Sequence, residues 1–245
     1  MKMSGNTILI TGGGSGIGQA LAHRFHDAGN HVIVVGRRQA ALDDTVAGRE
    51  RMSAYALDVD DTQALAAFAQ EVVERHPALN VLINNAGIMR MEDLTGPRDL
   101  ADAEATLRTN LLGPIRMTDA LIGHLSRQPG AAIVNVTSGL AFVPLVRTPT
   151  YSATKAGLHS YTVALREQLA GRVEVIELIP PAVQTDLTPG QATREGYMPL
   201  TEYIDEVMAL FAQEPAEVAV QRVNFLRRAE AEGRFGAALA TLNPR

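Results

Sequence analysis

Tyr151 and Lys155 stand four residues apart in the sequence. Residues at this spacing share one face of a helix, so a phenol and an ammonium group can point into the same cleft. Thirteen residues before Tyr151, Ser138 follows the apolar segment 132–136, which we expect to be a strand. Ligands of parallel α/β sheets bind beyond the carboxyl ends of the strands, where Ser138 would lie. A hydroxyl, a phenol and a cation gathered in one place can polarise a carbonyl and exchange a proton with it.

A glycine-rich turn, residues 12–18, follows the first apolar segment of the chain, residues 7–11. Glycine allows positive φ and lets the backbone approach a phosphate closely. A helix that begins behind such a turn offers free N–H groups and the positive end of its dipole to a pyrophosphate. The spacing differs from the G-x-G-x-x-G fingerprint, and a tight strand–helix turn without a ligand is the alternative. The first strand–helix connection favours a dinucleotide site, formed by Gly12, Gly14, Ser15, Gly16, Ile17 and Gly18.

The second apolar segment, residues 31–35, ends in Gly36-Arg37-Arg38. Sites that prefer NAD carry an acidic residue near this position, which bonds the ribose 2′-hydroxyl. No acid stands here, and guanidinium groups pair with phosphate through charge-assisted, bidentate bonds. Arg37 and Arg38 therefore predict recognition of a 2′-phosphate, hence NADP(H) in preference to NAD(H), with Arg37 the stronger candidate. The alternative is that both arginines are solvated residues at a helix start.

Composition excludes several other classes of protein. The 245 residues carry a net charge of −5 and no basic cluster, which argues against a nucleic-acid partner. The absence of cysteine excludes disulfides, thiolate zinc sites and a cysteine nucleophile. No segment approaches the ~20 apolar residues that cross a bilayer, and residues 1–6 leave no room for a secretory signal. We expect a cytoplasmic protein without a membrane partner.

Strand-like and helix-like segments alternate along the whole chain, which is typical of parallel βαβ units. The pattern predicts an α/β fold: one Rossmann-type domain over residues 1–245, with a doubly wound, mostly parallel seven-stranded sheet and helices on both faces. The expected strands are 7–11, 31–35, 53–57, 81–84, 132–136, 174–179 and a short 217–220. The expected helices are 16–28, 62–74, 99–112 with a kink or restart at Pro114, 152–170 and 201–211. The stretch 185–200 has no clear period and is expected to be a mobile substrate loop over the site.

Taken together, the motifs resemble the short-chain dehydrogenase/reductase family. The resemblance spans residues 7 to about 187, in the order and spacing of that family. It rests on Thr11-Gly12-x3-Gly16-Ile17-Gly18, Asn84-Asn85-Ala86-Gly87, Asn110, Ser138 and Tyr151-x3-Lys155. Within the family, the Gly-Arg-Arg element and a Pro–Pro turn at 180–181 resemble the group of DltE-like oxidoreductases, a likeness that gives no substrate.

This resemblance implies a role for each matched residue. Tyr151 would protonate the carbonyl oxygen in reduction and act as the base in the reverse direction. Lys155 would lower the pKa of Tyr151 and bond the nicotinamide ribose, Ser138 would polarise the carbonyl, and Asn110 would anchor a water that links Lys155 to solvent. Hydride passes directly between nicotinamide and carbon, so no metal is expected. Further cofactor contacts would come from Asp58, Val59, Asn84, Ala86, Gly87, Val183 and Thr185.

One position departs from the family pattern. The family has Pro-Gly-x-Val-x-Thr after the sixth strand, and here Pro181 replaces the glycine, which fixes φ and removes an N–H donor. The residues expected by position to line the substrate pocket are mainly apolar, and no basic residue stands where it would grip a carboxylate. A medium-sized hydrophobic ketone or aldehyde is therefore expected. The pocket residues are Met89, Leu140, Phe142, Leu145, Pro181, Tyr197 and Met198, each with membership of the ordinary core as the alternative.

Two classes of function remain open. The first is an NADPH-dependent carbonyl reductase or, run backwards, an alcohol dehydrogenase. The second is an NADP(H)-binding sensor of the same fold without turnover, which would need the glycine turn but not Ser138, Tyr151 and Lys155. Because all three are present, the enzyme is favoured. The resemblance further implies a homodimer or homotetramer that packs through the helices at 99–125 and 152–170.

Overall fold

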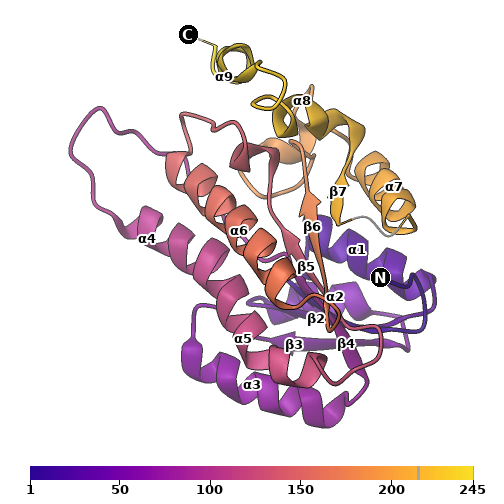
Figure 1. Cartoon of the computed structure of the whole chain (residues 1–245). Helices are drawn as coiled ribbons and strands as arrows, with labels where there is room; N and C mark the ends of the chain where they lie inside the picture. Colours follow the sequence, from indigo (N-terminus) through magenta and orange to yellow (C-terminus); the bar gives the residue numbers. More distant parts are fainter. Residues whose placement is uncertain (214–215, 245) are drawn as a thin grey trace.

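Seven strands form a single parallel sheet at the centre of the molecule (Figure 1). The computed structural model describes residues 1–213 and 216–244. The strands lie in the order β3-β2-β1-β4-β5-β6-β7, so the chain winds outward from β1 and then returns to the middle to wind the other way. This order confirms the predicted doubly wound, Rossmann-type sheet. The strands are β1 (Thr7–Thr11), β2 (His31–Gly36), β3 (Met52–Ala56), β4 (Leu79–Asn84), β5 (Ala132–Val136), β6 (Glu174–Ile179) and β7 (Glu217–Ala219).

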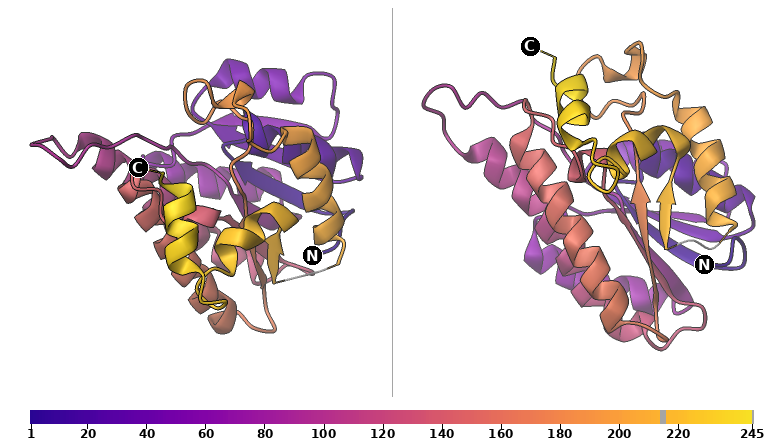
Figure 2. Two further views of the ribbon diagram at one scale, coloured as in Figure 1. Left: turned by 90° about the horizontal axis from the view of Figure 1, so that it is seen from above. Right: turned by 45° about the horizontal axis from the view of Figure 1, so that its top comes forward.

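Helices cover both faces of the sheet (Figures 1 and 2). On one face, α1, α2 and α7 bury Leu21, Leu42 and Tyr203 against the strands. On the other face, α3 and α5 bury Phe68 and Leu121 beside α6. The middle strands are covered on both sides, which explains their continuous apolar sequences. The helices are α1 (Gly16–Asp27), α2 (Gln39–Val46), α3 (Thr62–Arg75), α4 (Ala101–Leu107), α5 (Gly113–Leu125), α6 (Pro149–Gln168), α7 (Leu200–Phe211), α8 (Asn224–Arg227) and α9 (Phe235–Leu242).

The sequence predicts the type of each strand correctly, and the observed bounds differ from the predicted ones by at most two residues. The largest shift is in β4, which begins at Leu79 rather than at residue 81. Three helices, α2, α8 and α9, lie outside the segments predicted as helices, and each is short, with eight, four and eight residues. No helix among the described residues is long and apolar enough to cross a membrane.

The helix expected over 99–112 is divided in the structure. After α4, a π-helical turn covers Arg108–Leu112, and α5 begins at Gly113. The cause is Pro114, since it lacks the N–H that the carbonyl of Asn110 would accept in a regular helix, and its ring would clash with that carbonyl. Turns of this kind recur at functional sites. This one holds Asn110, a residue of the predicted site.

The stretch expected to be a mobile loop, 185–200, is irregular apart from a 3-10 turn at Gln191–Thr193. Two contacts tie its base to the body of the protein. Val183 and Met198 form a parallel bridge, and the buried side chain of Gln191 donates a 2.8 Å hydrogen bond to the carbonyl oxygen of Val183. These bonds fix where the loop starts and ends beside the sheet. Its movement over a substrate stays a prediction.

Candidate active site

The glycine-rich turn joins β1 to α1, and its backbone adopts conformations that require glycine. Gly12 and Gly16 have φ values of 68° and 54°, in the left-handed region that other residues rarely enter. Ser15 is the N-cap of α1, and within the part of the chain that the structure describes its side chain makes no capping bond. The N–H groups of the first turn of α1 are therefore left for a ligand in front of the helix.

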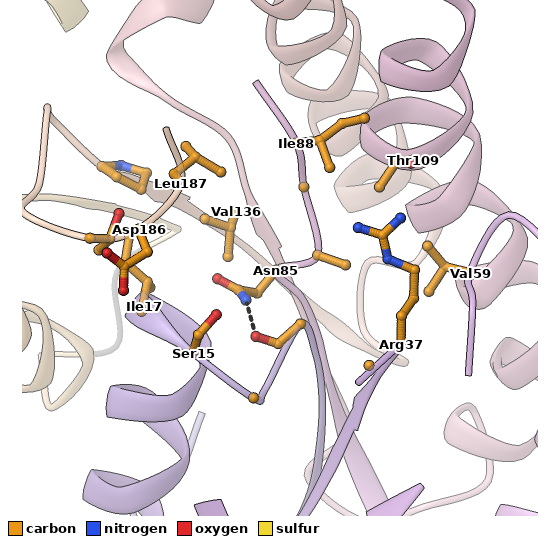
Figure 3. Close-up of a pocket in the computed structure, with 18 of the residues that line it drawn as sticks. Ser15, Ile17, Arg37, Val59, Asn85, Ile88, Thr109, Val136, Asp186 and Leu187 are labelled. Carbon is orange, nitrogen blue, oxygen red and sulfur yellow. Dashed lines mark hydrogen bonds between the residues drawn. The ribbon is translucent and has the colours of Figure 1, made fainter. Parts of the chain in front are cut away.

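Gly18 lies beneath this turn and not in the wall of the cavity, and its direct contact with a cofactor stays a prediction. A Cβ at Gly18 would collide with the carbonyl oxygen of Gly12 and with the amide of Asn85. Asn85 donates hydrogen bonds to the carbonyl oxygens of Thr11, at 2.9 Å, and of Gly12, at 3.3 Å. Gly18 thus allows the turn to pack onto Asn85, whose side chain Figure 3 shows in the middle of the site.

Arg37 and Arg38 follow β2 and line one end of the cavity. Both are exposed. Figure 3 shows the guanidinium group of Arg37 turned toward Val59 and Thr109. Arg38 reaches the other way, where its Nη2 lies 3.5 Å from the hydroxyl of Ser15 in the glycine turn. The two guanidinium groups therefore add positive charge beside the turn that would hold the phosphates.

Ser138, Tyr151 and Lys155 meet in the wall of the same cavity. Ser138 stands beyond the carboxyl end of β5, where its hydroxyl accepts the N–H of Leu140 at 3.1 Å. Tyr151 and Lys155 lie in the first turns of α6, because this helix begins three residues before the predicted start, at Pro149. Both side chains are buried, at 7% and 4% exposure, and Lys155 Nζ lies 5.6 Å from the centre of the Tyr151 ring.

Burial changes the proton affinities of both groups. It lowers the pKa of Lys155 to about 8, because an ammonium group loses its hydration there. It raises the pKa of Tyr151 to about 12, although the Ser138 hydroxyl opposes the rise. In this state of the protein, any lowering of the Tyr151 pKa by Lys155 is therefore smaller than the rise that burial causes. The loss of water around the phenol outweighs a cation that is directed to the carbonyl oxygen of Val136, at 2.7 Å.

Asn110 is fully buried behind the cavity wall. Its Oδ1 accepts the N–H of Ile88 and its Nδ2 donates to the carbonyl oxygen of Ile88, both at 2.8 Å. The same Nδ2 lies 3.5 Å from the hydroxyl of Thr154 on α6. Asn110 thus holds the backbone that lines the site against the helix of Tyr151 and Lys155. The water that would link it to Lys155 stays a prediction.

The side chain of Asn84 does not reach the cavity, and its part in the cofactor floor stays a prediction. It is the last residue of β4, and its side chain is 2% exposed. Its Nδ2 donates to Asn135 Oδ1 at 2.9 Å and to the Thr118 hydroxyl at 3.3 Å. The amide points into the layer between the sheet and the helices, and the next residue, Asn85, lines the site instead.

The cavity has a volume of about 410 Å³ and lies beyond the carboxyl ends of the central strands. Most residues predicted for the site line it, although they come from segments far apart in the sequence. They are Gly12, Gly14, Ser15, Gly16, Ile17, Arg37, Arg38, Asp58, Val59, Ala86, Gly87, Ser138, Tyr151, Lys155, Pro181, Val183 and Thr185. A volume of this size is within the range of small-molecule sites.

The residues predicted for the substrate pocket lie mostly outside this cavity, and their contact with a substrate stays a prediction. Of these residues only Pro181 lines the cavity; the residues outside the lining are Met89, Leu140, Phe142, Leu145, Tyr197 and Met198. After Ser138, a 3-10 turn at Gly139–Ala141 directs the chain toward α8. Phe142 therefore packs between His159 and Arg227, whose guanidinium carbon lies 4.6 Å from the centre of the ring. Met198 is 2% exposed and belongs to the core.

Several lining residues were missed from the sequence, although most follow a recognised motif directly. They are Asn85, Ile88, Arg90, Thr109, Asp186, Leu187 and Gln191. Figure 3 shows Asp186 and Leu187 on the same side of the site as Ile17. Arg90 also lines the cavity and pairs with Asp102 at 3.5 Å. That no basic residue grips a carboxylate of the substrate stays a prediction.

The residues of the cavity fit a nicotinamide dinucleotide. A Cβ at Gly14 or Gly16 would come 3.3 Å from Ala41 or 3.4 Å from the side chain of Thr185, and would narrow the turn in front of α1. The guanidinium groups stand at one end of the cavity, and the phenol and the ammonium stand among its lining with Ser138. Among residues 1–213 and 216–244, no group of three or more His, Asp or Glu side chains is arranged to hold a metal ion.

Comparisons with known proteins agree with this architecture. The family model for short chain dehydrogenases matches residues 6–196. The "Uncharacterized oxidoreductase DltE" of Bacillus subtilis is 40% identical over 235 residues, which cover 94% of this chain and 93% of that protein. "Sulfoacetaldehyde reductase 2" of Chromohalobacter salexigens is 32% identical, with 93% and 96% covered.

Among solved structures, a short chain dehydrogenase from Burkholderia cenocepacia in complex with NADP superposes with a TM-score of 0.85. It is 28% identical, and the match covers 99% of each chain. The chain therefore belongs to the short-chain dehydrogenase/reductase family and is an oxidoreductase of that family.

Proposed function

We propose that this protein is an NADPH-dependent oxidoreductase that reduces a medium-sized hydrophobic ketone or aldehyde to the alcohol, or catalyses the reverse oxidation. One observation carries the proposal. The Ser138 hydroxyl, the Tyr151 phenol and the Lys155 ammonium line the same cavity as the glycine turn before α1. A sensor without turnover needs the turn but has no use for a buried acid and a buried cation.

The chain's own residues account for the proton and the orientation of the substrate. Bound nicotinamide supplies the hydride that passes to or from the substrate carbon. Ser138 donates a hydrogen bond to the carbonyl oxygen and holds it beside Tyr151. The phenol of Tyr151 is protonated throughout the physiological pH range, because burial raises its pKa to about 12, so it is ready to donate a proton to the alkoxide oxygen. The positive charge of Lys155 stabilises the phenolate that remains.

Preference for NADP(H) rests on Arg37 and Arg38. Both guanidinium groups border one end of the cavity, where the adenosine of the cofactor would lie, and β2 ends in Gly36 where an NAD site would carry an acidic residue. A phosphate on the ribose 2′-oxygen would offset two positive charges that a plain ribose leaves uncompensated. The Burkholderia relative that is complexed with NADP lends support to this assignment.

The substrate class follows from the rest of the lining. Ile88, Pro181 and Leu187 give the cavity an apolar side, which suits the hydrocarbon part of a ketone or aldehyde. Arg90 adds one positive charge to the lining. Because a relative is named a sulfoacetaldehyde reductase, a small anionic aldehyde is a second candidate that Arg90 favours. A panel of substrates with and without an acidic group distinguishes the two.

The proposal includes a homo-oligomer in the cytoplasm. Leu107, Leu112 and Val163 are about two-fifths exposed, at 42%, 39% and 40%, on the surface formed by α4, the π-helical turn and α6. A second copy of the chain would bury these side chains by packing along the same helices. Light scattering at micromolar concentration tests this part of the proposal, and a monomer there would contradict it.

The test of the activity is the rate of NADPH oxidation with a panel of ketones, aldehydes and sulfoacetaldehyde. We expect turnover with at least one of them, and a loss of about 10²-fold or more in Tyr151→Phe, the effect typical of a general acid. NADPH binding should be unchanged in this variant. An absence of turnover with every carbonyl, together with tight NADPH binding, would favour the sensor and overturn the enzyme.

A further inference from the structure

The segment between β4 and α4, residues 85–100, makes the longest excursion from the body of the protein, and both views of Figure 2 show it projecting beyond α4. Its first residues, Ala86, Gly87 and Ile88, line the cavity. Most of the residues that follow are exposed, among them Leu94 at 59%. One side chain in this segment is an exception. The side chain of Glu92 is 4% exposed.

Glu92 is enclosed by groups that all donate to its carboxylate. Its Oε1 accepts the backbone N–H of Thr150 at 2.9 Å, and its Oε2 accepts the hydroxyl of the same residue at 2.7 Å. The guanidinium group of Arg98 bonds to Oε2 as well. The backbone N–H of Glu92 donates to the carbonyl oxygen of Arg147 at 2.9 Å. The two contacts between Glu92 and Thr150 join residues 58 positions apart in the sequence.

The carboxylate of Glu92 stays charged. Burial raises its pKa, but the hydrogen bonds from Arg98 and Thr150 outweigh that effect and bring the pKa below its ordinary value. The negative charge of Glu92 also lies at the start of α6, where the positive end of the helix dipole attracts it.

The start of α6 needs a group of this kind. Thr148 is the N-cap residue, and among the described residues its side chain makes no capping bond. Pro149 comes next and has no N–H to satisfy. The N–H of Thr150 is therefore the first donor of the helix without a partner inside the helix. Glu92 accepts it, so a residue of a distant segment caps the helix one position before Tyr151.

The other end of the same stretch is fixed to the cofactor side of the cavity. Ile88 is held by both amide atoms of Asn110, and Asn110 also approaches Thr154 on α6. Residues 87–92 thus form a bridge with two anchors. Asn110 fixes one end beside the cavity lining, and Glu92 fixes the other to the first turn of the helix of Tyr151.

From this geometry we propose that Glu92 is a positioning residue, which couples the cofactor-lining stretch 87–88 to the first turn of α6 and thereby sets where the Tyr151 phenol stands over the cavity. This inference rests on the proposed function for its kinetic consequence, but the coupling itself does not require turnover. A change of 1 Å in the place of a catalytic group can cost about 10²-fold in rate. Loss of Glu92 should therefore act on catalysis more than on binding.

The kinetic test compares Glu92→Ala, Glu92→Gln and Asp93→Asn. Asp93 is the matched control, because its carboxylate also closes a local turn, onto the N–H and hydroxyl of Thr95, yet it is exposed. We expect kcat to fall about 10-fold or more in Glu92→Ala, with the Kd for NADPH within about twofold of the wild type. Glu92→Gln keeps an acceptor for Thr150 and should recover part of the rate. Asp93→Asn should leave kcat unchanged.

Hydrogen exchange separates this inference from the proposed function. NADPH should slow exchange of the peptide that covers 147–155 in the wild type, and this slowing should be lost in Glu92→Ala and kept in Asp93→Asn. If the protein binds NADPH but turns over no carbonyl, the proposed function fails and the exchange experiment still decides the coupling. Unchanged kcat in a folded Glu92→Ala, or NADPH protection of 147–155 that persists in it, would overturn the inference. If Glu92→Ala does not fold, Glu92→Gln gives the same two readouts.

Discussion

The Nζ atom of Lys155 donates a 2.7 Å hydrogen bond to the carbonyl oxygen of Val136, the last residue of β5. This bond ties the helix of Tyr151 to the strand that ends two residues before Ser138. The ammonium group is buried, and the carbonyl oxygen is the partner that makes its burial tolerable. Lys155 therefore fixes the separation of the two hydroxyl-bearing residues, in addition to placing a charge beside the phenol.

Replacement of Lys155 by methionine should separate activity from stability. The variant loses the cation beside Tyr151, so we expect turnover to fall by about 10²-fold or more. It also removes a charged group that burial disfavours, so the Tm at pH 7 should stay level or rise. Thermal unfolding and NADPH oxidation, measured on the same preparation, check both parts. A Tm that falls together with the rate would show that the role of Lys155 is mainly structural.

The pKa of Lys155 can be measured directly, because the chain has only two lysines, Lys2 and Lys155. We expect the signal of Lys155 in protein with ¹³C-labelled lysine to titrate at a pKa of about 8 in the absence of cofactor, with Lys2 as the second signal for reference. The rate of reduction, as kcat/KM, should fall as pH rises through that value, because the cation is lost.

The same shift fixes a stability trend. The unfolded chain, with a lysine pKa near ~10.4, binds more protons than the folded one between the two values. The contribution of neutral Lys155 is therefore present above the unfolded pKa and lost as pH falls through about 8. A Lys155 signal that titrates in the ordinary lysine range would contradict both statements.

Substitution of Arg37 by alanine should change the choice of cofactor. We expect the Kd for NADPH to rise about 10-fold or more, the loss of one charge-assisted pairing of about 1.5–3 kcal/mol, while the Kd for NADH changes little. Fluorescence titration of both cofactors measures the ratio, and NADH is the internal control. Arg38→Ala, made in parallel, shows which guanidinium reads the 2′-phosphate. An equal loss for both cofactors would mean that Arg37 serves the fold and not the phosphate.

A methyl group at Gly18 should disrupt the glycine turn. In Gly18→Ala the new Cβ would collide with the carbonyl oxygen of Gly12 and with Asn85. We expect a loss of about 1–3 kcal/mol in the free energy of unfolding, as for other overpacked sites, together with weaker NADPH binding. The control is Gly123→Ala on α5, where a Cβ would have no heavy atom within 4 Å. That variant should be as stable as the wild type or more stable.

A pair of histidines near the amino ends of the strands should make the fold sensitive to acid. The rings of His31 and His76 lie 5.0 Å apart. Burial and then the charge of Arg51 lower the pKa of His31. Burial and then the charges of His31 and Arg75 lower the pKa of His76. Both rings are therefore neutral in the folded protein at neutral pH, and the unfolded state binds more protons below ~6.5.

The stability that these neutral rings contribute is complete above the unfolded pKa and is lost as pH falls through the lower, folded values. Between pH 7 and pH 5 the Tm of the wild type should fall. In His76→Gln it should fall by less, because this variant lacks one of the two rings that take up a proton on unfolding. Thermal unfolding across this range checks it, with His23→Gln as a single-histidine control. Identical slopes for wild type and His76→Gln would contradict the assignment.

The local sequence predicted those parts of the site that depend on spacing within one element. The positions of Tyr151 and Lys155 on one helix face, the glycine turn between a strand and a helix, and the alternation of strands and helices follow from periodicity and backbone chemistry. These rules act over a few residues, so they do not depend on the contacts that those residues make with the rest of the chain. For the same reason the order of the chemistry-bearing motifs was enough to indicate the family.

The other features of the site were decided by the tertiary structure, because the spacing of residues within one segment does not show which distant segment they will contact. Asn84 looked like a cofactor residue, yet its neighbours Asn135 and Thr118 draw its amide into the core. Glu92 gave no signal in the sequence, and only the folding of its segment onto Thr150 makes it the cap of α6. The pKa of Tyr151 likewise depends on how completely water is excluded around the phenol, and the packing of the whole domain sets that.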